Sequence, residues 1–326
     1  MQNLFTKTSY LNTPILFIVF NRPDATAKVF ESIKKARPPR LYVAADGPRQ
    51  DKIDDVEQIA KVRKIATAIN WPCEVKTLFR KKNLGCKYGC STAISWFFEH
   101  EEQGIILEDD CLPHHDFFYF CETLLNYYKN DSRIITIAGS NLQSNYKRSS
   151  ESYYFSKYFF CWGWASWRRA WECYDGKISF WPQWKSSEDW NKKFTDTVEK
   201  KYWKKVFELV YSNPPDTWDY PFIASAWKKG GLSAVSSVNL ISNIGFGEDA
   251  TRTTDPSYKD ANLPVESIGE IIHPKIVEQD KDKDRYVFDE NFDGRHLRMP
   301  GLLFSFPRRT YRFLLGKIKL ILNFYK

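Results

Sequence analysis

Residues 104–111 read Gly-Ile-Ile-Leu-Glu-Asp-Asp-Cys, an apolar run of strand length that ends in three consecutive carboxylates. Adjacent anions repel one another, so a fold that holds three together usually supplies a compensating charge. After a buried strand, we expect that charge to be a divalent cation, because Mg²⁺ and Mn²⁺ bind through one or two carboxylates together with substrate phosphates. A solvated acidic turn is the alternative, since short acidic runs are common. The triplet alone does not decide between the two.

The flanking sequence alternates between strand and helix patterns. The continuous apolar run at 13–20 predicts a strand buried on both faces of a parallel sheet. Further strands are expected at residues 40–45, 74–79 and 133–138. Helices are expected after Pro23 and over residues 51–69, 89–100 and 116–129. This order over about 140 residues predicts a doubly wound α/β fold.

Charged residues follow three of these strands. In such sheets, ligands bind outside the carboxyl ends of the strands. Arg22 follows the first strand, Asp46 the second, and residues 108–110 the central one. A guanidinium, a single carboxylate and a carboxylate cluster at one edge indicate a nucleoside-diphosphate site. No GxGxxG follows the first strand and no GxxxxGK[ST] occurs, which argues against a dehydrogenase and a P-loop NTPase.

Composition bounds the class of protein. The 326 residues, 43% hydrophobic and 17% aromatic, fit one large or two medium domains. Seven cysteines at irregular spacing match no metal pattern, and we find no signal peptide and no 18-residue apolar run, so we expect a reduced, cytoplasmic protein. The net charge of +8 suits anionic partners, whether nucleotide phosphates, acidic lipids or nucleic acid.

The order of motifs resembles GT-A glycosyltransferases, in particular the inverting N-acetylglucosaminyltransferase I type and its bacterial family-2-like relatives. The motifs are strand–NRP (21–23), strand–ADG (45–47), NLGCKYGC (83–90), IILEDD (105–110), FFCWGWASWRRAW (159–171) and TWDYPF (217–222). They span most of residues 13–255. The resemblance implies the GT-A fold, Rossmann-like, with a mixed central sheet flanked by helices. It also implies a donor-binding half at 1–140, an acceptor-binding and catalytic-base half of the same domain at 141–275, and a charged segment with a basic C-terminal helix at 276–326.

The resemblance also implies roles for the residues at the strand ends. Arg22 would lie near the diphosphate or the base, and Asp46 would hydrogen-bond the uracil or ribose. Glu108 and Asp109 would face the sugar and ribose, and Asp110 would be the direct ligand of Mn²⁺ or Mg²⁺. A metal on one carboxylate that bridges diphosphate oxygens neutralises the charge that develops on the leaving group.

Two further basic residues are candidates for donor binding. Lys87 in NLGCKYGC would add a positive contact, although an exposed helix lysine is equally compatible with its position. Arg252 follows a glycine-bearing turn that resembles the closing loop of these enzymes, and it would reach the diphosphate. The tryptophans at 159–171 would form either a platform beside the donor sugar and acceptor or a structural plug.

Asp219 is the candidate catalytic base. An inverting transfer needs one base to deprotonate the acceptor hydroxyl. Trp218 and Tyr220 flank Asp219, so desolvation could raise its pKa, and its position matches the catalytic carboxylate of the family. The alternative is a helix N-cap, in which case Asp189 is the reserve candidate, while Asp216 has the pattern of a turn residue and cap.

The last segment, residues 304–326, is rich in Lys and Arg, lacks acidic residues and interleaves Phe, Leu and Ile. This pattern is typical of a helix at an anionic membrane surface. A C-terminal helix docked on the enzyme is the alternative.

The sequence therefore predicts a metal-dependent hexosyltransferase of bacterial polysaccharide biosynthesis, peripheral on the inner face of the cytoplasmic membrane. It would transfer a sugar with inversion from a UDP-sugar, such as UDP-N-acetylglucosamine, to a glycan or lipid-linked acceptor, and no nucleic-acid partner is expected. A nucleotidyltransferase is one alternative, but it would carry a Gly-rich basic loop where this chain has NRPDAT. A non-catalytic glycan or nucleic-acid binder is the other, and it has no need of a strand-end carboxylate cluster together with Asp219.

Overall fold

The computed structural model describes residues 11–143, 150–247 and 258–298. Its strands are β1 (Ile15–Val19), β2 (Arg40–Ala45), β3 (Glu74–Phe79), β4 (Gln103–Glu108), β5 (Cys111–Pro113), β6 (Ile134–Ala138), β7 (Tyr153–Ser156), β8 (Trp164–Trp167), β9 (Leu232–Ser236) and β10 (Ile241–Asn243). Its helices are α1 (Pro23–Ala36), α2 (Asp55–Ala66), α3 (Gly85–His100), α4 (Asp116–Tyr127), α5 (Arg168–Trp171), α6 (Trp181–Trp184), α7 (Glu188–Lys192), α8 (Thr197–Ser212), α9 (Asp219–Lys229), α10 (Lys281–Asn291) and α11 (Gly294–Leu297).

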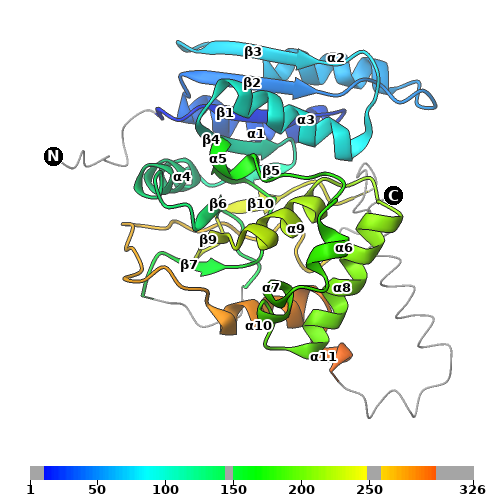
Figure 1. Cartoon of the computed structure of the whole chain (residues 1–326). Helices are drawn as coiled ribbons and strands as arrows, with labels where there is room; N and C mark the ends of the chain where they lie inside the picture. The colour runs from blue at the N-terminus through cyan, green and yellow to red at the C-terminus, as the bar shows by residue number, and fades with distance from the viewer. Residues whose placement is uncertain (1–10, 144–149, 248–257, 299–326) are drawn as a thin grey trace.

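One mixed sheet of eight strands runs through the molecule in the order β3-β2-β1-β4-β8-β6-β9-β7 (Figure 1). β3, β2, β1 and β4 are parallel neighbours, and β6 and β9 form a second parallel pair. β8 lies antiparallel between β4 and β6, and β7 closes the far edge antiparallel to β9. A separate two-stranded ribbon pairs β5 with β10. The mixed α/β sheet expected from the sequence is confirmed.

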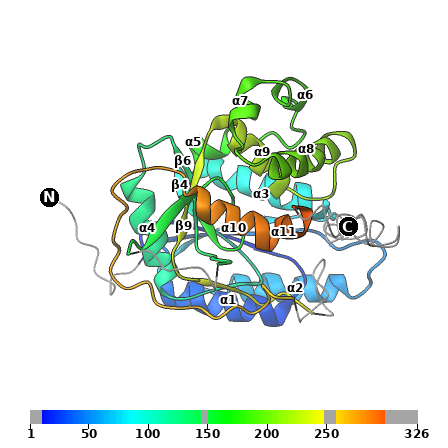
Figure 2. The same cartoon turned by 90° about the horizontal axis from the view of Figure 1, so that it is seen from below.

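Helices cover both faces of the sheet (Figure 2). Successive side chains of a strand point to opposite faces. Ile15 and Phe17 therefore join the core under α1, α2 and α4, while Leu16 joins the core under α3, α8 and α9. The central parallel strands β1 and β4 are buried on both sides, which is why each reads as a continuous apolar run, whereas the edge strand β3 is largely exposed.

The predicted elements of the first 140 residues are confirmed, with small shifts at their ends. The strands at 40–45 and 74–79 have the expected bounds. α2 is shorter than the expected 51–69 at both ends, and α3 begins at Gly85 rather than at residue 89. Gly85 has a φ of 76°, a left-handed conformation that suits glycine, and it lets the chain turn directly into the helix.

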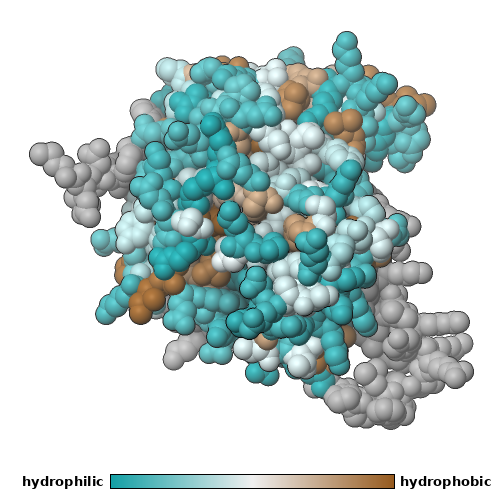
Figure 3. Space-filling view, in the orientation of Figure 1, coloured by the Kyte–Doolittle hydropathy of each residue, from teal (hydrophilic) through white to brown (hydrophobic). Residues whose placement is uncertain are grey.

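The face drawn in Figure 3 is mostly hydrophilic, with its hydrophobic residues in small separate groups. Within the described ranges, no helix combines the length and the apolar character that crossing a bilayer requires.

Candidate functional site

The ends of β1, β2 and β4 form one edge of the sheet, named here the carboxyl edge. Ile18 in β1 pairs with Glu108 in β4, and Val19 pairs with Ala45 in β2. The residues that follow these strands are therefore neighbours. This edge lies where ligands bind in α/β sheets.

Arg22 and the carboxylates after β4 form a compact ionic cluster. Arg22 donates through Nη2 to Asp109 Oδ1 and, at 3.0 Å, through Nη1 to Asp110 Oδ2. The backbone N–H of Phe20 donates to the other oxygen of Asp109 at 3.1 Å. Burial raises the pKa of Asp109, and the charge of Arg22 opposes that rise. Burial acts to lower the pKa of Arg22, but the charges of Asp109 and Asp110 outweigh it, so the guanidinium stays protonated.

The turn after β10 packs against this cluster. Asn243 pairs with Cys111, and the next residue, Ile244, donates its N–H to Asp110 O at 2.9 Å. A Cβ on Gly245 would overlap Asp110 Oδ2 and lie 2.5 Å from Arg22 Nη1. Gly245 is therefore the residue that lets this turn approach the ion pair. The glycine-bearing turn is visible in the sequence, but its contact with Asp110 is visible only in the structure.

The donor set at Asp110 fits a cation that takes one protein ligand. Arg22 occupies Oδ2, while Oδ1 accepts from the weak thiol donor of Cys111 at 3.5 Å. The side chain of Asp110 is 15% exposed, against 3% for Asp109. Asp110 would therefore be the residue that holds a Mg²⁺ or Mn²⁺ ion, with phosphates and water as the remaining ligands. Asp109, held by Arg22 and Phe20, is not placed for that role.

Asp46 follows β2 on the same edge and binds backbone rather than side chains. Its Oδ1 accepts from the N–H of Gly47 at 2.9 Å, and its Oδ2 accepts from the N–H of Leu84 at 2.8 Å. Burial raises its pKa, and these hydrogen bonds oppose the rise. A Cβ on Gly89 would lie 3.2 Å from Asp46 Oδ2, so α3 passes close to this carboxylate. Asp46 therefore joins the loop after β2 to the start of α3.

A second ionic group at this edge was not singled out from the sequence. Arg49 donates to Asp55 through Nε and Nη2 at 2.7 and 2.8 Å, and Asn21 Nδ2 donates to the same carboxylate at 2.8 Å. The bonds from Arg49 lower the pKa of Asp55 to about 2. The asparagine of NRP was the available signal, but its partner lies 34 residues away in the chain.

Lys87 lies beside the segment that leads to Asp219 rather than beside the Arg22 cluster. Its side chain is buried, and burial lowers its pKa, while Asp216 and Asp175 oppose that change. The N–H groups of Cys86 and Lys87 donate to Asp216 at 2.9 and 2.7 Å. Asp216 is thus a helix cap, as its sequence context indicated, but the helix it caps is α3.

Asp219 is the first residue of α9 and is 9% exposed. Its Oδ1 accepts from the Thr217 hydroxyl and, at 2.9 Å, from the N–H of Tyr220. Within the described part of the chain, no hydrogen bond is formed by Oδ2. Asp219 therefore satisfies one donor of the first helical turn with one oxygen and keeps the other free to accept a proton.

Cys161 connects the two halves of the site. Burial is the main cause that raises the pKa of its thiol, and the negative charges of Asp219, Glu108 and Asp110 add to the rise. Burial likewise raises the pKa of the Cys111 thiol, and interactions with Asp110, Glu108 and Cys161 add to the rise. The neighbours of Cys161 contact both sides of the site: Phe159 meets Trp218 at 5.7 Å between ring centroids, and Trp162 meets Phe246 at 5.8 Å. These contacts join segments that are distant in the chain, so the sequence alone does not single out Cys161.

The tryptophan-rich segment is mostly structural. Trp164 and Trp171 are buried and pack with Trp218, which stacks on Trp164 at 5.7 Å between ring centroids. Trp162 is partly exposed and meets Phe246, in the turn beside Asp110, edge to face at 5.8 Å. Gly163 has a φ of 61°, and a Cβ there would overlap Ile241. The plug interpretation holds for the buried rings, and Trp162 alone reaches the candidate site.

A separate group of possible metal ligands was not predicted. His114, His115 and Asp116 bring ligand atoms within 4.8 Å of one another, the one such group found in the described ranges. Asp116 already accepts from Ser267 Oγ at 2.6 Å and from Ile268 N–H at 3.1 Å. These bonds attach a distant segment to the start of α4, so a structural role accounts for Asp116.

Two predictions fall on parts of the chain that the structure does not describe. Arg252 and the segment 304–326 lie outside the described residues. The roles assigned to Arg22, Asp46, Lys87, Glu108, Asp109, Asp110 and Asp219 remain predictions.

No protein-family model and no curated protein matches the chain. Among solved structures, it is similar to S. aureus TarS 1–349 (11% identity, TM-score 0.37, 70% of this chain and 58% of that chain). It is also similar to HddC from Yersinia pseudotuberculosis (11%, TM-score 0.31, 52% and 86%) and to UDP-glucose pyrophosphorylase complexed with UDP-glucose (10%, TM-score 0.29, 50% and 79%). With TM-scores below 0.5 and identities of 11% or less, these similarities carry no argument about function.

Proposed function

We propose that this protein is a glycosyltransferase that uses a nucleoside-diphosphate sugar. One observation carries the proposal: an arginine, a carboxylate with an oxygen that the arginine does not use, and the segment that leads to the candidate base all meet at the carboxyl edge. Arg22 contacts Asp110. Asp46 accepts from a backbone N–H at the start of α3, and Asp216, three residues before Asp219, accepts from two further N–H groups of that helix. A diphosphate needs a cationic partner, and an acceptor hydroxyl needs a base. This edge offers both.

Arg22, Asp46 and Glu108 to Asp110 would form the donor side, within residues 1–140. The guanidinium of Arg22 is fixed by two carboxylates, so it would present its charge to a phosphate without first reorganising. A divalent cation on Asp110 would neutralise the diphosphate leaving group. Lys87 and Arg252 are the further candidates for positive contacts.

Asp219 would act as the base, in the acceptor half at 141–275. The acceptor oxygen attacks the anomeric carbon, the bond from that carbon to the diphosphate oxygen breaks, and the hydroxyl proton passes to Asp219 Oδ2. Attack opposite the leaving group inverts the anomeric centre. The Thr217 hydroxyl and the Tyr220 N–H hold Oδ1, which fixes the orientation of the carboxylate.

The test is calorimetric titration of UDP, GDP and CMP, each with and without Mn²⁺, into the wild type, Asp110→Ala and the exposed control Asp54→Ala. We expect one nucleoside diphosphate, UDP in the first instance, to bind only with metal and to lose affinity in Asp110→Ala but not in Asp54→Ala. Binding that needs no metal would keep the nucleotide site and remove the metal role of Asp110. No binding of any nucleotide would overturn the proposal.

Product analysis separates glycosyl transfer from nucleotidyl transfer. With UDP-glucose or UDP-N-acetylglucosamine, a glycosyltransferase that turns over slowly with water releases UDP. A nucleotidyltransferase with pyrophosphate releases UTP and a sugar phosphate instead. We expect the product to be UDP. The acceptor, proposed to be a glycan or a lipid-linked molecule, and binding to a membrane surface would then be tested next.

A further inference from the structure

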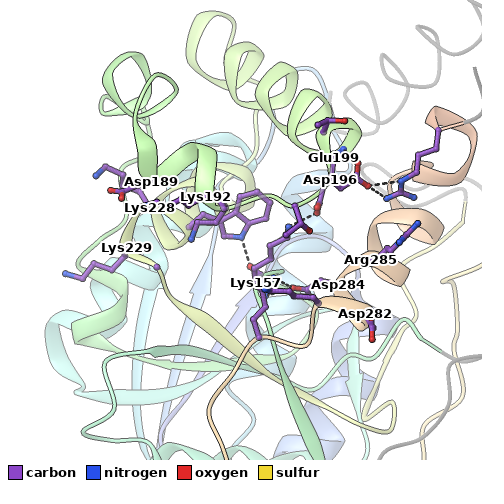
Figure 4. A pocket seen from close by; sticks show the side chains of 18 residues that line it. Lys157, Asp189, Lys192, Asp196, Glu199, Lys228, Lys229, Asp282, Asp284 and Arg285 are labelled. Atoms are coloured by element: carbon purple, nitrogen blue, oxygen red, sulfur yellow. Dashed lines mark hydrogen bonds and ion pairs between the residues drawn. The ribbon is translucent and has the colours of Figure 1, made fainter.

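A cavity of about 820 Å³ lies away from the candidate site, between α7, α8, the end of α9 and the start of α10 (Figure 4). Gly230 and Lys157 line it. Gly230 lies two residues before β9, and Lys157 follows β7, the antiparallel neighbour of β9. Because β9 is parallel to β6, which runs in the same direction as β4, the cavity lies at the edge opposite the carboxyl edge.

The lining of the cavity has an excess of positive charge. Eight basic and five acidic side chains contribute to it. Two of the acidic groups are already paired with cations: Glu199 with Lys157 at 2.8 Å, and Asp196 with Arg298. Asp284 accepts hydrogen bonds from Ser156 at 2.5 Å and from Gln279 at 2.7 Å. Asp189 and Asp282 remain, and both are exposed.

Five of the cations have no carboxylate of their own. Within residues 11–143, 150–247 and 258–298, no ion pair is formed by Lys193, Lys228, Lys229, Lys281 or Arg285. They come from three places in the chain, after α7, at the end of α9 and in α10. Figure 4 places Lys228 and Lys229 on one side of Lys157 and Arg285 on the other. Like charges gathered without partners favour an anion that binds among them.

Burial strengthens this preference at the base of the cavity. Lys157 is 6% exposed, with its Nζ 4.7 Å from the ring centre of Phe194 and 5.4 Å from that of Trp227. Lys193 is partly buried beside it, and burial, then repulsion from Lys157, lowers the pKa of Lys193. A bound anion would offset that repulsion in a region where water screens charge poorly.

The cavity is a separate site rather than an extension of the donor site. Helix α9 begins at Asp219 and ends at Lys229, 11 residues in all, so the candidate base and the cavity lie about 15 Å apart along its axis. A small donor molecule cannot occupy both. The volume is that of a site for a compact organic ligand, for which about 300–1,000 Å³ is usual.

We infer that this cavity binds a ligand carrying two or more phosphate groups, at a site distinct from the donor site. Lysines act as point charges and suit phosphate oxygens that approach from several directions. Cations from three segments of the chain require charges spread over the ligand, which a single phosphate does not provide. The ligand could be a soluble polyphosphate ester or the phosphate-bearing surface of a lipid bilayer.

The experiment uses the full chain in EDTA, so that a metal-dependent donor site does not contribute. Inorganic tripolyphosphate is titrated by calorimetry, and vesicles of phosphatidylglycerol or of phosphatidylcholine are used in sedimentation. Lys193→Ala/Lys229→Ala removes two cavity cations, while Lys228→Glu/Lys229→Glu changes only exposed residues and carries little risk to folding. Lys201→Ala/Lys205→Ala is the matched control, because both lysines are exposed on α8 outside the cavity.

We expect both cavity variants to weaken the binding of at least one probe by about tenfold or more, while the control and Asp110→Ala bind within about twofold of the wild type. If the cavity variants bind tripolyphosphate more weakly, the ligand is a soluble polyphosphate ester. If they lose binding only to phosphatidylglycerol vesicles, the ligand is a membrane surface. If neither probe distinguishes the cavity variants from the control, the inference is wrong. If Asp110→Ala still binds the probe, the binding does not depend on the proposed donor site, so the inference can fail or hold separately from the proposed function.

Discussion

At the scale of single residues, Asp219 and Gly245 bear most directly on the proposed chemistry. Asp219 uses one oxygen to hold the start of α9 and leaves the other without a partner in the described part of the chain. The N-cap role that the sequence offers as the alternative is not borne out, because Trp218 occupies the N-cap position and Asp219 is the first helical residue. The oxygen that Asp219 keeps without a partner among the described residues is compatible with the proposed role as base. Gly245 contributes by lacking a side chain where the turn meets Arg22 and Asp110.

Asp219→Asn should lower kcat for sugar transfer by at least about 100-fold, because an amide cannot accept the proton of the acceptor hydroxyl. The affinity for the donor should change little, since the carboxylate would act on the acceptor. Initial rates and calorimetric donor binding, measured on the same preparation, check both statements. Asp54→Asn, an exposed change at the start of α2, is the control. A rate within threefold of the wild type would exclude Asp219 as the base. Asp189, the reserve candidate, lines the cavity at the opposite edge of the sheet and is not placed for that role.

Gly245→Ala should weaken nucleotide binding by about tenfold or more while the protein stays folded. The new Cβ would overlap Asp110 Oδ2 and crowd Arg22, so the ion pair or the turn must shift. Calorimetric titration of UDP with Mn²⁺, together with circular dichroism, measures the two effects. Gly247→Ala is the comparison, because no atom lies within 4 Å of its added Cβ. Its φ of 145° means that this variant introduces backbone strain without crowding the ion pair. Unchanged affinity in Gly245→Ala would separate this turn from the donor site.

At the scale of elements, α3 depends on a residue 130 positions away. Leu84 occupies its N-cap position and cannot cap with a side chain, while Asp216 accepts from the N–H groups of Cys86 and Lys87. A carboxylate at this end also interacts favourably with the helix dipole. The segment just before α9 therefore holds the start of the helix that carries Lys87, which connects the proposed acceptor half to the donor half.

Asp216→Ala should lower the free energy of unfolding by about 1–2 kcal/mol, the usual cost of removing a helix cap. It leaves two N–H groups of α3 without their acceptor. Urea denaturation followed by fluorescence measures the change. Asp216→Asn should cost less, because its amide oxygen can still accept one of the two bonds. Equal stability of all three proteins would show that water replaces the cap without cost.

At the scale of the whole molecule, a buried polar network attaches α10 to the sheet. Asp284 in α10 is 2% exposed and accepts from the Ser156 hydroxyl at the end of β7 and from the N–H of Lys157. The ammonium of Lys157 in turn pairs with Glu199 of α8. Burial raises the pKa of Asp284 to about 6, and its hydrogen bonds together with the charge of Lys157 limit that rise. The charged form is therefore disfavoured in the folded state.

A carboxyl whose pKa is raised on folding holds more protons in the native state, so its contribution to stability falls as the pH rises. For Asp284 the loss should run from its ordinary pKa near 4 up to about pH 6, and reach about 1–3 kcal/mol. Asp284→Asn removes this titration. The variant should therefore gain stability relative to the wild type between pH 4 and 7, as measured by urea denaturation at each pH. A difference that stays constant over this range would contradict the raised pKa.

Local chemistry in the sequence determined the elements and their order. Apolar runs such as residues 15–19 and 105–107 marked buried strands, and the polar residues that end them predicted which edge of the sheet would hold the site. These features depend on neighbouring residues and on the period of the chain, which the sequence shows directly. The acidic triplet, the arginine after the first strand and Asp219 could all be named in this way.

Only the tertiary structure decided which of these residues contact one another and which keep an oxygen without a partner in the described part of the chain. The compensating charge expected for the triplet is supplied at Asp109 and Asp110 by Arg22, 87 and 88 residues away, and Arg22 does not use the second oxygen of Asp110. Asp216 caps α3 and Gly245 meets the ion pair, which are likewise contacts between distant segments. Hydrogen bonds and charges act over a few ångströms in space, so partners distant in the chain become visible only once the sheet has brought them together.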